Sequence, residues 1–236
     1  LDPLAMAGAV PPYAVTHMAI EHVPTDIGLP TARLRGNAHG YTAFFNECFV
    51  DELAHAARRE PLSYRIAMLG HDVRLAACLQ RVAANANWDG GADNSGQGLA
   101  CHKIGDGRIA VVATARRDDT GVRVDKISAI ADIGRIVNLD IARQQIEGGL
   151  VFGLGLAVGS STEYDKGLPT SNRLRSLNLP LLADCPEIEV DFIESEADPA
   201  DPGELGVAAI APAVANALFS ATGLRFRRLP LLSEGL

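Results

Sequence analysis

The order of apolar and polar positions in the first 88 residues predicts a short strand followed by helices. Residues 14–22 alternate loosely between the two kinds and suit a strand, although prolines stand before and after them. Residues 41–58 repeat apolar side chains at helical spacing, with Asp51 and Glu52 expected on the wetter side and Glu47 half-buried. The stripe that we expect to face the core is Phe45, Phe49, Leu53 and Ala56.

Two further helices are expected before residue 88. Pro61 suits the first turn of one helix, which ends near Gly70. Asp72 is a predicted N-cap for the next helix, because its carboxylate can accept hydrogen bonds from the free amides of the first turn. The apolar stripe of this third helix is Leu75, Cys78, Leu79 and Val82.

A segment rich in Gly, Asp, Asn and Ser, residues 89–98, marks a change of pattern. After it, β-branched and alternating runs predict strands, with turn residues 118–121 between the second and the third. The expected strands are 98–103, 108–116, 122–131, 187–193 and 225–229. The class is therefore α+β, and we divide the chain into residues 1–88, helix-rich with N-terminal strands, and residues 89–236, mixed α/β.

Two helices are predicted within this second part. The first, residues 141–158, contains four glycines: Gly148, Gly149, Gly153 and Gly155. Each glycine costs a helix roughly 1 kcal/mol, so their number indicates that something approaches the backbone closely. The spacing slightly favours a neighbouring helix over a cofactor. The second helix, residues 207–222, has almost no charge, which is typical of a buried helix, and Gly223 is its expected C-cap.

The dipeptide Gly203-Glu204 stands between an acidic, proline-broken loop and this buried helix. Partial desolvation at such a position raises the pKa of a carboxyl group and suits it to act as a general base. The alternative role is structural, because the helix dipole also favours a carboxylate in the first turn. The local sequence on its own favours the structural role.

Charge and composition exclude several classes of function. A net charge of −8 disfavours a nucleic-acid surface, and no apolar run reaches the roughly 18 residues of a membrane span. The histidines show no H-E-x-x-H spacing and no C-x-x-C occurs, so we expect no metal ligands in the chain. We expect the four separated cysteines to be buried thiols: Cys48, Cys78, Cys101 and Cys185. The first residue is Leu, which is expected of a processed product, an expressed segment or a piece of a longer protein.

Five stretches together carry a resemblance that none carries alone. They are residues 34–40, 45–54, 132–138, 145–149 with Gly153, and 203–204 with the alanine-rich helix that follows. In this order they resemble the C-terminal part of the molybdopterin-binding large subunit of the xanthine dehydrogenase family. The branch most similar is the isoquinoline 1-oxidoreductase β-subunit type, which includes aldehyde-oxidising members.

The resemblance implies a molybdenum hydroxylase that inserts a water-derived oxygen at an N-heteroaromatic or aldehyde carbon. It implies a molybdenum–molybdopterin cofactor, in the cytosine dinucleotide form, without a protein ligand to the metal, and iron–sulfur clusters on a partner subunit. Glu204 matches the glutamate that acts as general base. The positions that match cofactor-contacting residues are Arg35, Gly36, Gln145, Gly148, Gly149 and Gly203.

The chain departs from the family pattern at four positions: Ala38 for a glycine, and Leu139, Ala208 and Ala209 for prolines. We expect its partners to be the remainder of the large subunit and an iron–sulfur small subunit, with a homo-oligomer as a further possibility and neither nucleic acid nor a membrane span involved. Alone it should be inactive, and the compartment is either cytoplasmic or periplasmic. The alternative function is a non-catalytic assembly or interaction module, and a hydrolase using Glu204 comes third.

Overall fold

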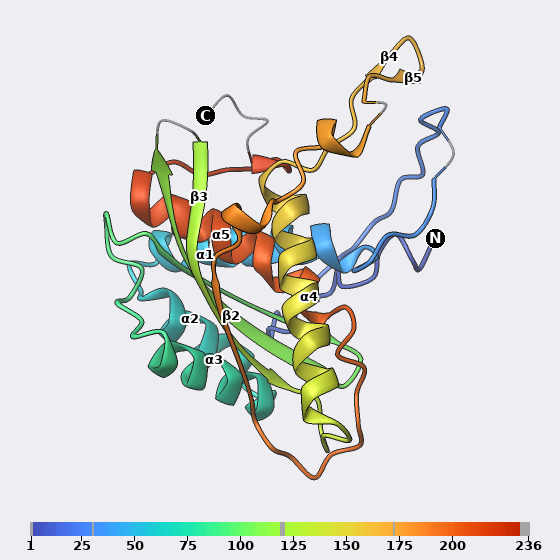
Figure 1. Ribbon diagram of the computed structural model, residues 1–236. Helices are drawn as coiled ribbons and strands as arrows, with labels where there is room; N and C mark the ends of the chain where they lie inside the picture. The colour runs from blue at the N-terminus through green and yellow to red at the C-terminus, as the bar shows by residue number, and fades with distance from the viewer. Residues whose placement is uncertain (1, 30, 119–120, 172, 232–236) are drawn as a thin grey trace.

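The computed structural model describes residues 2–29, 31–118, 121–171 and 173–231. Its centre is a four-stranded sheet with the order β1-β2-β3-β6 (Figure 1). Strands β1 (Gln97–Ile104), β2 (Gly107–Asp118) and β3 (Gly121–Asp132) form an antiparallel meander. Strand β6 (Glu187–Phe192) then adds parallel to β3. These four strands were all predicted, but Asp119 and Thr120 of the predicted turn lie outside the described residues.

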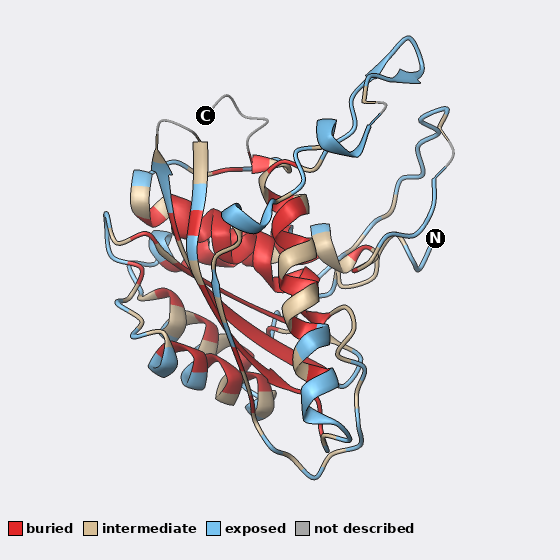
Figure 2. Ribbon diagram, in the orientation of Figure 1, coloured by how far each residue is buried: buried red, intermediate tan, exposed pale blue. Residues whose placement is uncertain are grey.

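Helices cover both faces of the sheet, because successive side chains of a strand point to opposite faces. From β2, Ile109 and Val111 enter the core shared with α4 (Leu139–Val158) and α5 (Leu205–Thr222). Ala110 enters the second core, which contains apolar residues of α2 (Pro61–Leu69) and α3 (Val73–Asn85). Figure 2 shows the strands buried between these two helical layers. The α+β class is confirmed.

Local capping explains where these helices begin. The Glu60 carboxylate accepts hydrogen bonds from the first turn of α2, and the predicted cap Asp72 accepts one from the Leu75 amide at 3.1 Å. The Asn138 side chain caps α4 by accepting from the Ile141 amide at 3.0 Å, so this helix starts two residues before its predicted start. Leu139 thus occupies the first helical position, where a proline is also well tolerated.

Helix α5 is buried on nearly all sides, as its uniform apolarity predicts. It lies so close to β1 that a Cβ atom on Gly98 would stand 2.0 Å from the Ala217 nitrogen. Gly223 ends the helix in the left-handed conformation, with φ of 73°, as expected. By length and composition α5 could cross a membrane, but 83% of it is buried inside the protein, as in a core helix.

Helix α1 (His39–Ala56) faces the core with a different side from the predicted one. Phe45 and Phe49 are 59% and 57% exposed, whereas Asp51 is only 3% exposed and Glu47, expected to be half-buried, is 1% exposed. The predicted stripe was wrong because a cation from another helix meets these carboxylates inside the protein. That cation is Arg65 of α2, whose side chain is fully buried.

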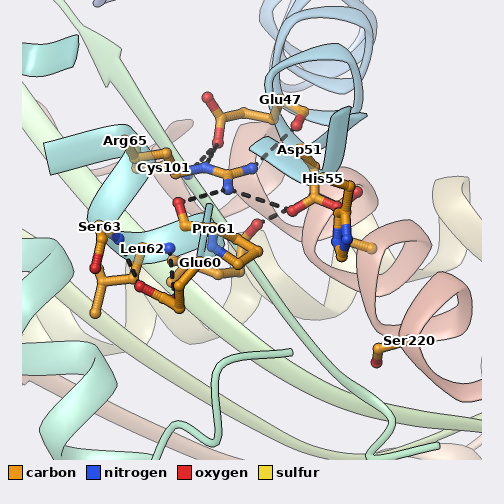
Figure 3. A network of polar contacts seen from close by, with 12 residues as sticks. Glu47, Asp51, His55, Glu60, Pro61, Leu62, Ser63, Arg65, Cys101 and Ser220 are labelled. Atoms are coloured by element: carbon orange, nitrogen blue, oxygen red, sulfur yellow. Dashed lines mark hydrogen bonds and ion pairs between the residues drawn. The ribbon is translucent and has the colours of Figure 1, made fainter. Parts of the chain in front are cut away.

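The Arg65 guanidinium joins α1 to α2 (Figure 3). It donates to Glu47 Oε2 at 3.0 Å and to Asp51 Oδ1 at 3.3 Å, while the Glu47 carboxylate also accepts from the Tyr13 hydroxyl and the Cys101 amide. Burial alone would raise the pKa of Asp51, but its hydrogen bonds and the neighbouring guanidinium hold it below its usual range. The contacts make this polar cluster part of the core.

Two predicted strands are wrong. Residues 14–22 are coil, tied to α2 by the hydrogen bond from the Ala14 amide to the Met68 carbonyl, and prolines on both sides interrupt any longer pairing. Residues 225–229 are also coil, because Arg225 turns inward, where it pairs with Asp51 at 2.8 Å.

Within residues 160–184, the described positions form a small two-stranded ladder and two single 3-10 turns. Their bounds are β4 (Tyr164–Asp165), β5 (Leu168–Pro169), η1 (Leu174–Ser176) and η2 (Leu182–Asp184). In the described part of the chain the first strand begins at Gln97, so the N-terminal strands are absent there. The division at residue 88 stays a prediction.

Candidate functional site

Glu204 stands at the N-cap position of α5 and is half-buried. Its side chain makes no capping hydrogen bond, so a structural role for this carboxylate would rest on the helix dipole alone. Instead, Glu204 Oε2 accepts a hydrogen bond from Asn37 Nδ2 at 2.8 Å. A residue 167 positions away in the sequence therefore orients the candidate base.

Arg35 connects three of the predicted site segments. Its Nε donates to the Gly203 carbonyl at 2.9 Å, and a terminal nitrogen donates to the Gln145 carbonyl at 3.1 Å and to Gln145 Oε1 at 3.2 Å. A Cβ atom on Gly148 would lie 3.5 Å from the other terminal nitrogen. The structure thus brings together Arg35, Gln145, Gly148 and Gly203 beside Glu204.

Gly36 fits where a side chain would not. It adopts φ of 93°, and a Cβ atom there would stand 2.6 Å from Val207 Cγ1. The glycine lets the loop from Leu34 to Asn37 lie directly on the first turn of α5. Ala38, which replaces a family glycine, has a helical conformation with φ of −70° and precedes α1, so this position does not need a glycine here.

The four glycines of α4 face three sets of neighbours, with Gly155 against Pro180 and Ser160. Gly149 and Gly153 face α5: added Cβ atoms would meet Gly206 Cα at 3.2 Å and Ile210 Cγ2 at 2.5 Å. Gly148 faces away from that contact, toward Arg35. The close neighbour of Gly149 and Gly153 is therefore a helix, the alternative that the spacing favoured, and Gly148 is the glycine whose backbone is open toward the site.

The substitutions that follow Glu204 leave the helix intact. Ala208 and Ala209 are completely buried in the first two turns of α5, and the helix begins directly after the glutamate. Glu204 consequently occupies a fixed point at the helix end without the two prolines of the family pattern.

Two cavities are lined by parts of this constellation. The larger, about 760 Å³, is lined by Arg35, Asn37, Ser160 and Val207 among others. The smaller, about 280 Å³, is lined by Glu204 together with Asp106 and Asp201. Asn37 is the link, since it lines the first cavity and donates to the carboxylate that lines the second.

The larger cavity has the size and the polar groups to receive one side of a pterin-sized heterocycle. Its volume lies within the range of small-molecule sites, about 300–1,000 Å³. It offers a guanidinium and an amide, and Ser160 Oγ is buried with no hydrogen-bond partner among the described residues. An unpaired buried hydroxyl is costly, so a polar ligand would satisfy it. The residues present therefore fit the group that the sequence resemblance implies.

Metal ligands are a separate question. The described residues contain no group of three or more His, Cys, Asp or Glu side chains that could hold a metal ion. Three of the four thiols, Cys48, Cys78 and Cys101, are buried as expected, whereas Cys185 is half-buried. Burial raises the pKa of the Cys78 thiol to about 12, which keeps it protonated.

The sequence did not reveal the histidine pair next to the site. His39 Nδ1 and His102 Nε2 are 2.8 Å apart, and the rings meet edge to face. Burial lowers the pKa of His102 to about 3, with His39 as a smaller cause, and burial also lowers the pKa of His39 despite the nearby Glu204. Both rings are therefore neutral at pH 7. A hydrogen-bonded pair between residues 63 positions apart leaves no local signal in the sequence.

Comparisons with known proteins show the family to which the chain belongs. Residues 48–186 match the family described as "Molybdopterin cofactor-binding domain". The chain is 30% identical, over 98% of its length, to the membrane-bound aldehyde dehydrogenase [pyrroloquinoline-quinone] of Gluconacetobacter polyoxogenes. It is 26% identical over 98% of its length to the beta subunit of isoquinoline 1-oxidoreductase from Brevundimonas diminuta, and 28% over 96% to a nicotinate dehydrogenase subunit from Pseudomonas putida.

The chain spans only part of these proteins: 33%, 30% and 21% of their respective lengths. Among solved structures, the aldehyde oxidoreductase from Desulfovibrio gigas superposes with a TM-score of 0.67 at 14% identity. That match covers 84% of this chain and 40% of the other. At this identity the likeness shows the fold alone.

Proposed function

We propose that this chain, which belongs to the molybdopterin cofactor-binding domain family, supplies one wall of the catalytic site of a molybdenum hydroxylase. The relatives named above are, by their names, an aldehyde dehydrogenase, an isoquinoline 1-oxidoreductase subunit and a nicotinate dehydrogenase subunit, and all three are oxidoreductases. The observation that carries the proposal is the convergence of Arg35, Gln145, Gly203 and Glu204 from segments up to 168 residues apart.

Each residue has a distinct task in this proposal. Gln145 is exposed and offers its carboxamide to the pterin, while the open backbone at Gly148 allows close approach. Arg35 fixes the relative positions of Gln145 and Gly203 through its three hydrogen bonds. Gly149 has a packing role in addition to any contact with the cofactor, since it touches α5.

When bound, the molybdenum–pterin group would take two electrons from the substrate carbon and pass them to iron–sulfur clusters on a partner subunit. This chain contributes the proton chemistry. Glu204 Oε2 is held by Asn37, and Oε1 accepts no hydrogen bond from the described residues, so Oε1 is the atom that receives a proton from the attacking water-derived oxygen. We propose an N-heteroaromatic or aldehyde substrate and the cytosine dinucleotide form of the cofactor.

The chain should act only with the remainder of a large subunit. It spans at most a third of the relatives' length, and neither cavity is enclosed by the described residues. A surface for such a partner is available on α1, where Tyr41, Phe45 and Phe49 are exposed on one stripe. The same stripe also supports the second candidate function, a non-catalytic interaction module.

Turnover of the assembled enzyme separates these functions. Glu204→Gln keeps the shape of the side chain and removes the base. Normalised to bound molybdenum, its turnover should fall by about 10²–10⁴-fold, while molybdenum content stays unchanged. Glu147→Gln on α4 serves as a control for the loss of one carboxylate. A Glu204→Gln enzyme within a few-fold of its parent would reject the catalytic role and favour the module.

A further inference from the structure

The hydrogen bond between Asn37 and Glu204 has a defined direction. An ionised carboxylate only accepts hydrogen bonds, so the amide group must present its nitrogen, as it does at 2.8 Å from Oε2. Within the described part of the chain, no second donor reaches the Glu204 carboxylate. Its orientation therefore depends on one amide.

The backbone of Asn37 suits this role. It is in the left-handed region, with φ of 44°, where asparagine is among the few side chains that are well tolerated. The backbone N–H of Asn37 donates to the Leu34 carbonyl at 2.9 Å and closes a turn. On one side Gly36 lies against Val207, and on the other Arg35 holds the Gly203 carbonyl. The loop therefore contacts Gly203, which precedes Glu204, and Val207, which follows it. These two contacts leave the Asn37 side chain little freedom to move away from the carboxylate.

We infer that Asn37 is a positioning residue: its amide holds Oε2 and so fixes Oε1 as the oxygen that accepts the proton. The inference rests on the proposed function of Glu204. In this role Asn37 acts through the carboxylate and not by contact with the reacting atoms.

The cleanest variant is Asn37→Gly, because glycine accepts the same positive φ and removes only the amide. Glycine also increases the conformational entropy of the unfolded chain and so lowers stability. A control variant with the same entropic cost is therefore needed. Asn87 provides it: this residue is exposed and has φ of 50°. Asn87→Gly should leave turnover unchanged.

The contact can be tested first without activity. In thermal unfolding of the full chain, Asn37→Gly should shift the midpoint more in the parent than in a Glu204→Ala background, since the hydrogen bond is already lost there. Asn87→Gly should give the same shift in both backgrounds. Equal shifts for Asn37→Gly would overturn the contact.

In the assembled holoenzyme, Asn37→Gly should lower kcat roughly 10- to 100-fold, because a displaced catalytic group loses its alignment. KM and molybdenum content should stay within about twofold, which a general loss of structure would not allow. Added to Glu204→Gln, the same change should have no further effect on kcat.

If Glu204→Gln abolishes turnover but Asn37→Gly behaves like Asn87→Gly, the positioning role is overturned and the proposed function stands. If Glu204→Gln leaves turnover intact, the positioning role of Asn37 and the proposed function are both rejected.

Discussion

Helices α1 and α5 have the same length, 18 residues, and pack against one another, yet they stabilise the fold in opposite ways. Helix α5 is apolar all round and buried on nearly all sides. Helix α1 buries two carboxylates, Glu47 and Asp51, and exposes the aromatic stripe of Tyr41, Phe45 and Phe49. The difference shows that the residues a helix packs against decide which of its sides is buried, and that its apolar pattern alone does not.

Loss of the buried ion pairs between Arg65 and the carboxylates of α1 should give the largest effect on stability. Arg65→Ala leaves Glu47 buried without a cation and Asp51 with Arg225 alone, and removing one partner of a buried ion pair costs about 3–5 kcal/mol. Arg81→Ala is the matched control, because Arg81 pairs with Asp191 at the exposed surface and should cost about 0–1 kcal/mol. Urea unfolding measures both, and similar costs for the two variants would contradict the comparison.

The pair of His39, at the start of α1, and His102, in β1, should make the stability of the protein depend on pH. Because the pKa of His102 is lowered to about 3 in the folded protein, the unfolded chain binds a proton below its ordinary pKa of about 6.5 and the folded chain does not. Stability should therefore be fully present above pH 6.5 and decrease by up to about 1.4 kcal/mol per pH unit as the pH falls toward 3. His102→Gln should flatten this dependence in urea unfolding between pH 4.5 and 7.5. Parallel curves for parent and variant would show that His102 does not cause it.

The contact between α4 and α5 offers a sharper test of packing. Gly153→Ala would place a methyl group 2.5 Å from Ile210 Cγ2 and 2.9 Å from the Val207 carbonyl, so overpacking should cost about 1–3 kcal/mol. Gly148→Ala, on the same helix, meets only the Arg35 side chain at 3.5 Å and should be neutral or gain up to about 1 kcal/mol from helix propensity. Opposite signs of the two effects are the expected result. Destabilisation by both would mean that Gly148 is also packed.

The exposed stripe of α1 should give the smallest effect on folding. Phe45→Ser with Phe49→Ser should change unfolding by less than about 0.5 kcal/mol, because both rings are already in solvent. The pair of changes should instead reduce the self-association of the isolated chain, measured by sedimentation velocity. Serine at the exposed Val73 of α3 is a control outside the stripe. A parent chain that is monomeric at high concentration would contradict the role of this surface.

The same contrast explains what the sequence could predict. Helix α5 and the meander were predictable because uniform apolarity and β-branched runs between turn residues do not depend on distant partners. The inner face of α1 was not, since Glu47 and Asp51 are stabilised by Arg65, 18 and 14 positions away on another helix. Coil at residues 14–22 and 225–229 depends likewise on tertiary contacts.

The candidate site follows the same rule. Arg35, Gln145 and Glu204 were found through the family resemblance, and the structure brings them together. Asn37 and His102 were missed, because each acts through a contact that only the folded chain creates. Local sequence favoured a structural role for Glu204 at the positive end of the helix dipole; the carboxylate stands at the N-cap position of α5 without a capping hydrogen bond.

The central claim is that this chain forms one wall of a molybdopterin site and needs the remainder of a large subunit to complete it. The most direct measurement is the molybdenum and pterin content of the chain purified alone and of the chain co-produced with that remainder, in a host that makes the cofactor. The account predicts no stoichiometric cofactor on the isolated chain and one cofactor per assembled subunit, reduced when Gly148→Leu fills the open backbone beside Arg35. Stoichiometric molybdenum on the isolated chain, or full occupancy in the Gly148→Leu assembly, would contradict it.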